Sequence, residues 1–469
     1  MLSKGLVRKS GLYFIGNFSS KIMTSLLIPI YAFYINADDL GYFDSNQAMM
    51  GILSPIIILA IWEAVLKYIL IENDVNIKRK IVTSSALFSF VISIILLLGI
   101  ALFDAIYDFE VKYFGLVAAM IILNSCVYLW QYYARAFKYN KLFVVSGILS
   151  TLVNFIFVII LVVTMKMGLI GLLLSYCAGQ VATIITIEIK VRVVRMFKFS
   201  DFDIKWVKRM IAFSLPLVLN LTSAWLISGF GRLIITAKLG VYENGLYSFA
   251  NKFPLVITMI GSVITMAIIE ESILSVKSKK RGEDFGRTIE SLFKIFQSIA
   301  IMAVPAIVVF YYFISKTEYH ESLIYVPGLL VYAVANTMAS NMGSMFQALD
   351  KTKYQFLTTA IGGLVTVVLA VCLIDKIGIP AVIAGQVSGA IAMLMLRYFL
   401  VQRFTVFKVK WSPILIMAIV FCTVAMICLN TNVMISVLVE ILILGWIIYL
   451  NRKFVMLGWE TIKSKVMNK

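Results

Sequence analysis

The chain alternates between long apolar runs and short polar connections. Fourteen runs cover it from end to end, at roughly residues 11–35, 42–70, 81–103, 112–134, 142–164, 168–190, 210–236, 243–269, 289–314, 321–346, 354–374, 378–400, 411–430 and 433–450. A helix needs about 20 residues to cross the hydrocarbon core of a bilayer. The runs are continuous and do not alternate residue by residue, which favours helices over the strands of a barrel. The pattern predicts an all-α integral membrane protein with about 14 transmembrane helices.

Composition agrees with this prediction, because 61% of the residues are hydrophobic and the mean hydropathy is +0.96. The first residues, MLSKGLVRKSGLYF, resemble the basic region of a signal peptide. No small-residue cleavage site follows the apolar stretch, so we predict that this stretch is the first permanent span. The five cysteines lie within apolar runs, and His320 is the single histidine. Their spacing fits neither a metal site nor a disulfide framework, so no metal, cofactor or catalytic residue is predicted.

The connections between the runs differ in charge on the two sides of the predicted membrane. One side carries Lys4/Arg8/Lys9, Lys78/Arg79/Lys80, Arg135/Lys138/Lys141, the run from Lys190 to Arg209, Lys277 to Arg287, Lys351/Lys353, Arg397 to Lys410 and Arg452 to Lys469. The other side carries Asp38/Asp39, Asp104/Asp108/Glu110, Lys166, Glu243, Glu318/Glu321 and Asp375/Lys376. Basic connections face the cytoplasm, which predicts a multi-pass protein of the cytoplasmic (inner) membrane with both termini cytoplasmic.

The net charge of +18 therefore reflects membrane topology, and no nucleic-acid partner is predicted. The two longest basic connections, about 190–209 and 270–288, are amphipathic. We expect them to lie on anionic lipids of the inner leaflet, although their charge also fits a role in topology alone.

The chain repeats itself at an offset of about 200–212 residues. Asp39-Leu40-Gly41-Tyr42-Phe43 resembles Glu243-Asn244-Gly245-Leu246-Tyr247, and Gly168-Leu169-Ile170-Gly171 resembles Gly378-Ile379-Pro380-Ala381. Each copy holds six spans, so both begin on the same side and form parallel repeats with a site between them. The predicted organisation is an N-terminal lobe (1–200), a C-terminal lobe (201–405), and two further helices with a cytoplasmic tail (406–469).

The whole chain resembles the polysaccharide-transport branch of the MOP superfamily, the Wzx-type flippases for O-antigen or capsule repeat units. The motifs that carry the resemblance are Gly11-Leu12-Tyr13-Phe14-Ile15-Gly16-Asn17, Ile28-Pro29-Ile30-Tyr31 and Asp39-Leu40-Gly41-Tyr42-Phe43, after a basic N-terminus. The resemblance implies two lobes, a cationic central cavity and alternating access. It also implies an oligosaccharide substrate linked to undecaprenyl pyrophosphate. Pro380 stands where Ile170 stands in the first copy, and no motif fixes the glycan.

Four of the basic residues within predicted spans are candidates for function, because a cation there is costly and commonly functional. These candidates for a cationic substrate site are Lys21, Lys252, Arg232 and Lys67. Lys21 is about 15 Å deep, and its alternative role is a structural ion pair with Glu63 or another buried acid. Lys252 precedes Pro254, which is expected to kink the helix, so Lys252 alternatively caps freed carbonyls.

Arg232 and Lys67 also have purely structural interpretations. Arg232 lies near a span end, where its side chain can reach the surface, although arginine also suits phosphate. Lys67 follows Glu63 by four residues, which favours an intrahelical ion pair.

Polar residues at helical spacing supply further candidates. The predicted cavity lining comprises Asn17, Asn251, Asn336, Ser340 and Gln347. Small and amide side chains of this kind also permit close helix packing. Glu63 and Glu440 lie within spans and are candidates for coupling transport to a proton or sodium gradient.

Other classes of protein remain open from the residues alone. A membrane polymerase or acyltransferase would normally use a histidine or a clustered dyad, which the predicted spans lack, so an enzyme is disfavoured. A multidrug or cation exporter of the same superfamily would favour an acidic cavity. A peptidoglycan-precursor flippase would move a similar anionic lipid. Membrane lipids are expected partners, together with a polysaccharide polymerase and a chain-length regulator.

Overall fold

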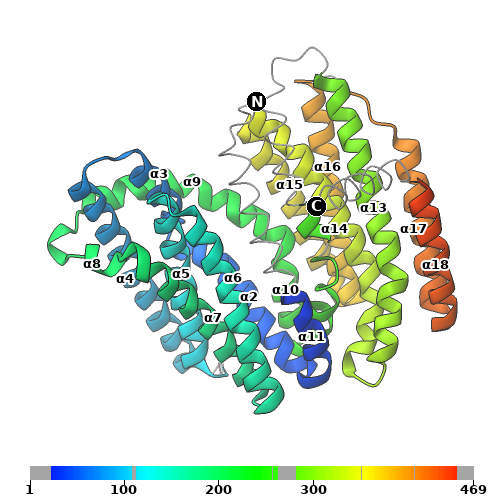
Figure 1. The fold of residues 1–469 in the computed structure, drawn as a ribbon, viewed down its shortest axis with the longest axis horizontal. Coiled ribbons are helices and arrows are strands. Elements are labelled where there is room, and N and C mark those ends of the chain that lie inside the picture. The colour runs from blue at the N-terminus through cyan, green and yellow to red at the C-terminus, as the bar shows by residue number, and fades with distance from the viewer. Residues whose placement is uncertain are drawn as a thin grey trace, which may run out of the picture.

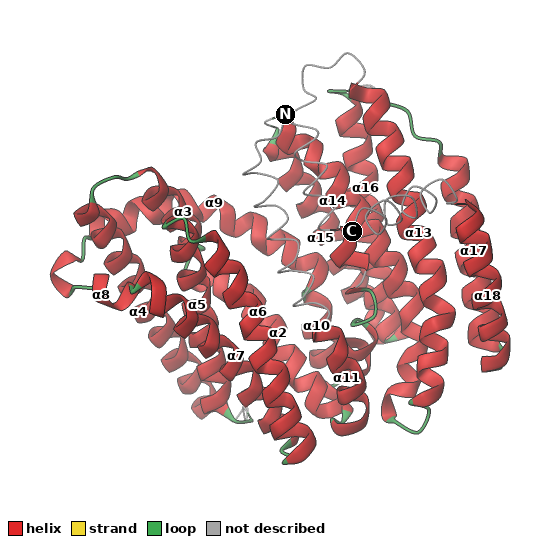
Figure 2. Cartoon of the chain, in the orientation of Figure 1, coloured by secondary structure: helices red, strands yellow, loops and turns green. Residues whose placement is uncertain are grey.

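The computed structural model describes residues 23–107, 112–255, 257–261, 281–349, 351–405 and 407–450. Helices in the first half are Met23–Tyr34, α2 (Ala37–Ile57), α3 (Ile61–Ile71), α4 (Val75–Tyr107), α5 (Phe114–Ala136), α6 (Asn140–Phe157), η1 (Val158–Thr164), α7 (Gly168–Val191), α8 (Val193–Met196) and η2 (Phe199–Asp201). The second half holds α9 (Ile204–Ser228), α10 (Phe230–Lys238), α11 (Val241–Ala250), α13 (Arg281–Phe313), η4 (Glu318–Tyr325), α14 (Val326–Ala348), α15 (Thr352–Ile377), α16 (Ile379–Gln402), α17 (Trp411–Asn430) and α18 (Val433–Leu450). Figure 2 shows that short loops join them.

The all-α membrane fold is confirmed. Each of the fourteen predicted ranges contains helix within its described part. In the described residues, ten helices are long and apolar enough to span a bilayer, and the bent pair α2 and α3 adds an eleventh. The shorter apolar helices Met23–Tyr34 and Val433–Ile447 lie in the predicted first and last spans.

The helices form two lobes that lie side by side at one end and apart at the other (Figure 1). The N-terminal lobe contains α2 to α8, and the C-terminal lobe contains α10 to α16. Helices α17 and α18 pack on the outside of α13. The lobes meet where α2 packs against α10 and α11. We call this the junction end, and the opposite end, where α4 and α13 begin, the open end.

Helix α9 connects the two lobes. Its packing partners include α3 and α4 of the N-terminal lobe and α15 of the C-terminal lobe. Near the open end, Trp206 and Phe213 of α9 pack edge-on against Tyr68 of α3. Gly229 separates α9 from α10 and closes α9 with a hydrogen bond to the Trp225 carbonyl (2.7 Å).

Two predicted spans are interrupted. Helices α2 and α3 are bent by 54° at a break that contains Leu59 and Ala60, both with left-handed backbone angles. The second break follows α11, where residues 251–254 form turns instead of helix. Pro254 lacks the N–H that would continue the helix. The interruption expected from Pro254 is confirmed, and it places Lys252 outside regular helix.

Helix α2 begins five residues earlier than the predicted range. The Asn36 side chain accepts a hydrogen bond from the backbone N–H of Asp39 (2.7 Å), which caps the first turn. Asp38 and Asp39 then lie in that turn, where negative charge is favoured by the helix dipole. These two acids therefore belong to a helix end and not to a free loop.

Candidate functional site

Two glycines bring the lobes into close contact at the junction end. Gly41 of α2 faces Gly245 of α11, and a Cβ atom at Gly41 would collide with the backbone of Val241 and Gly245. A Cβ atom at Gly245 would collide with the carbonyl of Ala37. The absence of both side chains lets the two backbones cross at the contact. The crossing fixes which side chains of α2 and α11 meet across the lobe boundary.

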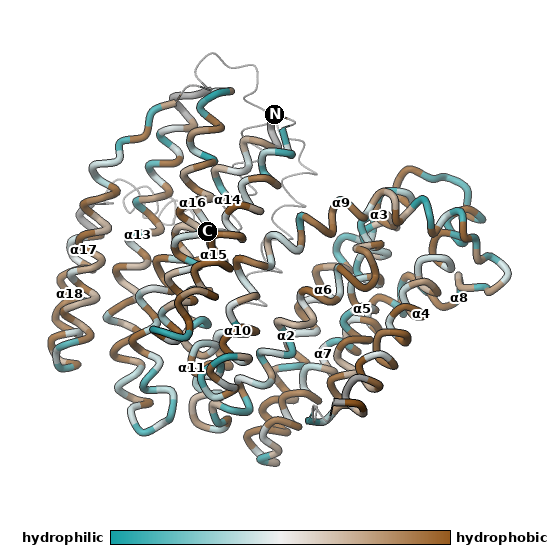
Figure 3. Tube along the Cα trace, turned by 180° about the vertical axis from the view of Figure 1, so that it is seen from behind, coloured by the Kyte–Doolittle hydropathy of each residue, from teal (hydrophilic) through white to brown (hydrophobic). Residues whose placement is uncertain are grey.

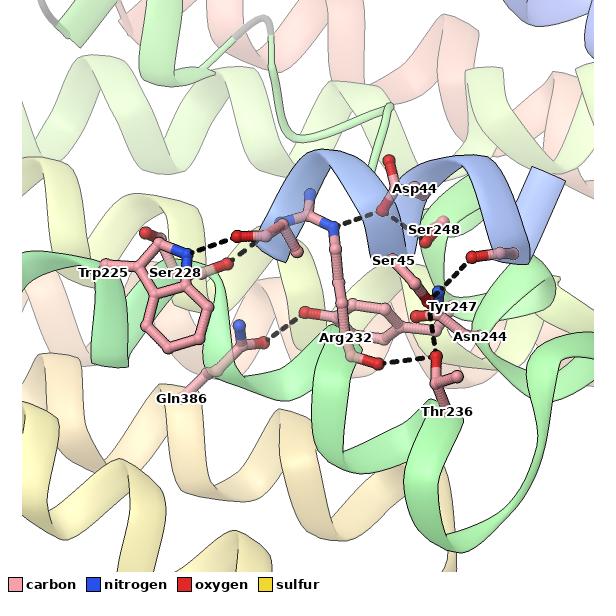
Figure 4. A network of polar contacts seen from close by, with 12 residues as sticks. Asp44, Ser45, Trp225, Ser228, Arg232, Thr236, Asn244, Tyr247, Ser248 and Gln386 are labelled. Carbon is pink, nitrogen blue, oxygen red and sulfur yellow. Dashed lines mark hydrogen bonds and ion pairs between the residues drawn. The ribbon is translucent and has the colours of Figure 1, made fainter. Parts of the chain in front are cut away.

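One turn further along α2, a buried acid meets a cation of the other lobe (Figure 4). The carboxylate of Asp44, which is 6% exposed, forms an ion pair with the guanidinium of Arg232 on α10. The hydroxyl of Ser248 on α11 donates to the same carboxylate oxygen of Asp44 (2.6 Å). An ion pair in low dielectric is strong once both partners are desolvated, and removing either partner leaves a costly charge.

Hydrogen bonds extend this junction on both sides of the ion pair (Figure 4). The Asn244 amide donates to the Gly41 carbonyl (2.8 Å) and to the Ser45 hydroxyl (2.9 Å). Ser45 also shares a hydrogen bond with Thr236 of α10 (2.6 Å). These bonds pair the Asn244 amide nitrogen and the Ser45 hydroxyl across the lobe boundary, whereas the Asn244 Oδ1 atom has no partner among the described residues.

The loops at the junction end are also joined. The backbone N–H of Ala37 donates to the Glu318 carboxylate (2.8 Å). The Tyr319 hydroxyl lies 3.0 Å from the carbonyls of both Ile35 and Asn36. Glu318 and Tyr319 belong to η4, so a segment of the C-terminal lobe covers the start of α2.

A polar cavity of about 270 Å³ lies beside the junction and reaches both lobes. Its lining residues are Thr24, Leu27, Tyr31, Phe43, Gln47, Ser150, Thr151, Asn154, Val158, Leu172, Tyr176, Gly179, Gln180 and Lys252. Lys252 is the charged member of this set and follows α11 of the C-terminal lobe, whereas the others come from the helix Met23–Tyr34 and from α2, α6, η1 and α7. Its ammonium lies 4.9 Å from the centre of the Tyr31 ring.

The break after α11 explains how Lys252 reaches the cavity. Asn251 and Lys252 occupy the turn that replaces the next helical residues, and both are half-buried. Asp44 pairs with Arg232 within 4.0 Å, and no ion pair of that kind joins Lys252 to a described acid. Lys252 therefore presents a cation to a cavity whose other polar groups are amides and hydroxyls.

The predicted cations have different surroundings. Lys252 lines the cavity, whereas Arg232 is held in the interlobe ion pair and donates to the Ser228 carbonyl (3.2 Å). The ammonium of Lys67 is exposed and lies 3.9 Å from the centre of the Phe213 ring. The predicted Glu63–Lys67 ion pair is absent from the described ion pairs, because Glu63 instead accepts a hydrogen bond from Tyr132 (2.6 Å).

The remaining candidates do not gather in one place. Asn17 and Lys21 lie outside the described residues, as does the side chain of Gln347. Thr24, which follows Asn17 by seven residues and Lys21 by three, a spacing that places residues on one face of a helix, lines the cavity. Asn336 and Ser340 lie on α14 outside the cavity lining, and the exposed Ser340 hydroxyl donates to the Asn336 carbonyl (2.9 Å).

The two acidic candidates for ion coupling are also separate from the cavity lining. Glu63 lies in the first turn of α3. Glu440 is half-buried on α18, and its Oε2 atom has no hydrogen-bond partner among the described residues. A carboxylate in this position has an unsatisfied acceptor at the edge of the C-terminal lobe.

Two charged residues of this architecture were missed by the sequence analysis. Asp44 was overlooked, although a carboxylate so soon after the start of an apolar run is itself unusual. The prediction that Arg397 begins a basic connection is wrong. Arg397 lies within α16 and is 3% exposed. Its guanidinium is buried because acceptors on neighbouring helices surround it.

Arg397 joins three helices of the C-terminal lobe. Its guanidinium donates to the Ala339 carbonyl (2.6 Å), the Gln355 carbonyl (3.4 Å), the Thr358 hydroxyl (3.0 Å) and the Thr359 hydroxyl (2.8 Å). These acceptors belong to α14 and α15. Gly343 of α14 leaves the space that the guanidinium fills.

Arg397→Met is therefore expected to destabilise the protein by about 3 kcal/mol, because charged hydrogen bonds are lost and their acceptors stay buried. Thermal melting of the purified protein in detergent measures this effect. Arg403→Met removes an exposed arginine on the same chain segment and is expected to change stability by less than about 0.5 kcal/mol. Equal melting temperatures for the two variants would contradict the assigned role of Arg397.

Comparisons with known proteins agree with this architecture. The model of the polysaccharide biosynthesis protein family matches residues 6–269. A structure of the lipid II flippase MurJ in an inward closed conformation covers 95% of this chain and 99% of its own, with 13% identity and a TM-score of 0.71. An inward-facing multidrug resistance MATE transporter of the MOP superfamily covers 89% and 96%, with 14% identity and a TM-score of 0.58.

A further MATE structure, in complex with MaD3S, covers 88% of this chain and 96% of its own, with 15% identity and a TM-score of 0.54. None of the curated proteins matched the chain. The structural similarities establish the shared fold, and the family match covers more than half of the sequence. The chain is thus a multi-pass membrane protein of the polysaccharide biosynthesis protein family, and it shares its fold with MurJ and with MATE transporters.

Proposed function

We propose that this protein is a flippase for undecaprenyl-pyrophosphate-linked oligosaccharide repeat units of O-antigen, capsule or exopolysaccharide. It would act in the cytoplasmic membrane with both termini in the cytoplasm, as the charge of the connections indicates. The observation that carries the proposal is the polar cavity that Lys252 lines at the lobe boundary. The family match to polysaccharide biosynthesis proteins supports the choice of a glycan.

The chemistry of the cavity suits a sugar attached to a phosphate. Amides and hydroxyls from the N-terminal lobe, among them Gln47, Asn154 and Gln180, offer both donors and acceptors to sugar hydroxyls. Lys252 offers a positive charge to pyrophosphate. Without such groups, a charged headgroup would lose its hydration in the membrane core with no compensation.

Alternating access would follow from the arrangement of the lobes. The lobes are joined by the Asp44–Arg232 pair and its neighbours at the junction end and lie apart at the open end. For the cavity to open toward the opposite side of the membrane, the contacts at the junction end must separate. The isoprenoid tail would stay in the bilayer while the headgroup passes between the lobes. A proton or sodium gradient would drive the cycle, and a polymerase and a chain-length regulator would receive the product.

Cells that lack this protein provide the direct test. We expect them to lose surface polysaccharide and to retain the lipid-linked repeat unit on the cytoplasmic leaflet, and analysis of that unit identifies the glycan. Arrested wall growth with accumulated peptidoglycan precursor would instead identify a peptidoglycan-precursor flippase, an alternative that the fold similarity to MurJ favours. Unchanged surface polymer with increased drug sensitivity would overturn both in favour of a multidrug exporter.

A further inference from the structure

An apolar groove of about 550 Å³ lies on the N-terminal lobe between α4, α5 and the segment that follows α7. Phe90 and Ile94 of α4 line it and are exposed, and Trp130 of α5 and Phe197 lie at its wall. Helices α4 and α8 lie at the edge of this lobe farthest from the C-terminal lobe (Figure 1). The groove therefore faces the surrounding bilayer and is remote from the lobe boundary and Lys252.

The segment at one end of the groove, residues 192–203, is held in a defined position. The Glu188 carboxylate accepts hydrogen bonds from the Trp130 indole (3.0 Å) and from the backbone N–H of Val194 (3.0 Å). The backbone N–H of Lys198 donates to the Thr83 hydroxyl of α4 (3.3 Å). The segment is thus attached to both walls of the groove.

The same segment carries exposed positive charge beside exposed apolar side chains. Arg192, Arg195 and Lys198 are exposed, and none belongs to an ion pair within 4.0 Å among the described residues. Val194 and Phe199 are 63% and 75% exposed. Basic and apolar residues together place a segment at the level of lipid headgroups. Figure 3 shows that hydrophobic residues predominate along α4 and α5, whereas the chain near α8 is more polar.

Two serines supply polar groups deeper in the groove. Ser89 of α4 and Ser125 of α5 line the groove, are each 3% exposed, and their hydroxyls have no hydrogen-bond partner among the described residues. Ser89 lies six residues beyond Thr83, about 9 Å along the helix axis. A buried hydroxyl without a partner is uncommon. At this depth below the basic segment, it can donate to a fatty-acid ester carbonyl.

We infer that this groove is a binding site for one anionic glycerophospholipid of the inner leaflet. The phosphate contacts Arg195 and Lys198, the ester region reaches Ser89, and one acyl chain lies along Phe90 and Ile94. The occupant is a resident membrane lipid and not the transported one, because a transported lipid must reach the boundary between the lobes. The inference does not depend on which headgroup the protein moves.

Native mass spectrometry of the full-length protein tests this site. The detergent-purified protein is incubated with equal amounts of phosphatidylglycerol and phosphatidylcholine that have the same acyl chains. The wild type is expected to retain phosphatidylglycerol preferentially. Arg195→Ala/Lys198→Ala is expected to weaken that retention by about fivefold for each residue, with phosphatidylcholine unchanged. Arg403→Ala/Lys408→Ala, which removes two exposed cations between α16 and α17, is the matched control and is expected to behave as wild type.

A second variant separates the groove from surface charge. Ser93→Phe places a large side chain in the groove and is expected to reduce retention of both lipids while the basic segment is intact. Equal retention of the two lipids by the wild type would overturn the inference. Equal losses of phosphatidylglycerol retention in the two double variants would also overturn the inference, because they would indicate a general attraction of the lipid to basic surfaces. If Ser93→Phe does not fold, the comparison of the two double variants still shows whether Arg195 and Lys198 are responsible for retention of phosphatidylglycerol.

Discussion

Lys252→Ala is expected to reduce export of the lipid-linked oligosaccharide on the order of 100-fold. The variant removes the cation that the described cavity presents to an anionic headgroup. Truncation of one partner in a desolvated charge contact typically costs several kcal/mol. The measurement is the ratio of surface polysaccharide to lipid-linked repeat unit retained in cells. Lys21→Ala combined with Lys252→Ala is expected to abolish export while expression is preserved.

Lys238→Ala is the control for this prediction. Lys238 forms an exposed ion pair with Asp375 (3.2 Å) and is outside the cavity lining. The control removes the same charge from the same lobe, so it corrects for effects of net charge on insertion. Unaltered export in the Lys21→Ala/Lys252→Ala variant would refute a cationic cavity.

Asp44→Ala is expected to destabilise the protein by about 3 kcal/mol, because it leaves the half-buried Arg232 guanidinium without its counter-ion. Thermal melting of purified protein measures the change. The double variant Asp44→Ala/Arg232→Met removes both charges and is expected to recover most of the stability. Export is expected to remain impaired in both variants, because the contact that holds the junction end together is missing.

Asp375→Ala gives the matched comparison for Asp44→Ala. It also removes an acid from an ion pair with a basic residue, but Lys238 and Asp375 are 47% and 65% exposed. An exposed pair contributes about 0–1 kcal/mol. A melting temperature lowered equally by the two substitutions would show that burial of the Asp44–Arg232 pair has no effect. Additive losses in the double variant would show that the two residues do not interact.

These two predictions assign different tasks to two neighbouring cations. Asp44 neutralises Arg232, so that cation is committed to contact between the lobes. Lys252 lies at the break after α11 and faces the cavity. Loss of Arg232 is therefore expected to affect stability and conformation. Loss of Lys252 is expected to affect binding and export of the substrate. Sequence position alone predicts that both belong to one cationic site.

The spans and the α11 break follow from local features of the sequence. Continuous apolar runs determine where helices can cross a bilayer, and Pro254 lacks the backbone N–H that an uninterrupted helix would use. By contrast, the α2–α3 break contains Leu59 and Ala60, which give no turn signal. The local signal nearest to this bend is Pro55, two residues before the end of α2, which was not used in predicting the spans.

The polar contacts were harder to predict because their partners are distant in sequence. The Ser248–Asp44 hydrogen bond joins residues 204 positions apart. Asp44 also follows the acidic pair Asp38 and Asp39, which suggested a loop in contact with water. Neither its burial nor its partner Arg232 can be inferred from local charge, since both depend on how the lobes meet.

The errors over Arg397 and over Glu63 with Lys67 have a related cause. Arg397 is near the end of its span, where position alone favours exposure, but acceptors from α14 and α15 surround it. The spacing of Glu63 and Lys67 permits an intrahelical pair worth only a few tenths of a kcal/mol. Tyr132 and Phe213, from other helices, interact with these side chains instead.

The glycine crossing has a consequence for the symmetry of the molecule. Gly41 and Gly245 occupy equivalent positions in the two repeats and lie against each other. An isologous homodimer of two six-helix subunits would place one residue opposite itself in this way. Two aspartates facing each other at the next turn would repel, but here Asp44 faces Ser248. Fusion of the halves into one polypeptide permits unequal charge on the two lobes, which identical subunits cannot have.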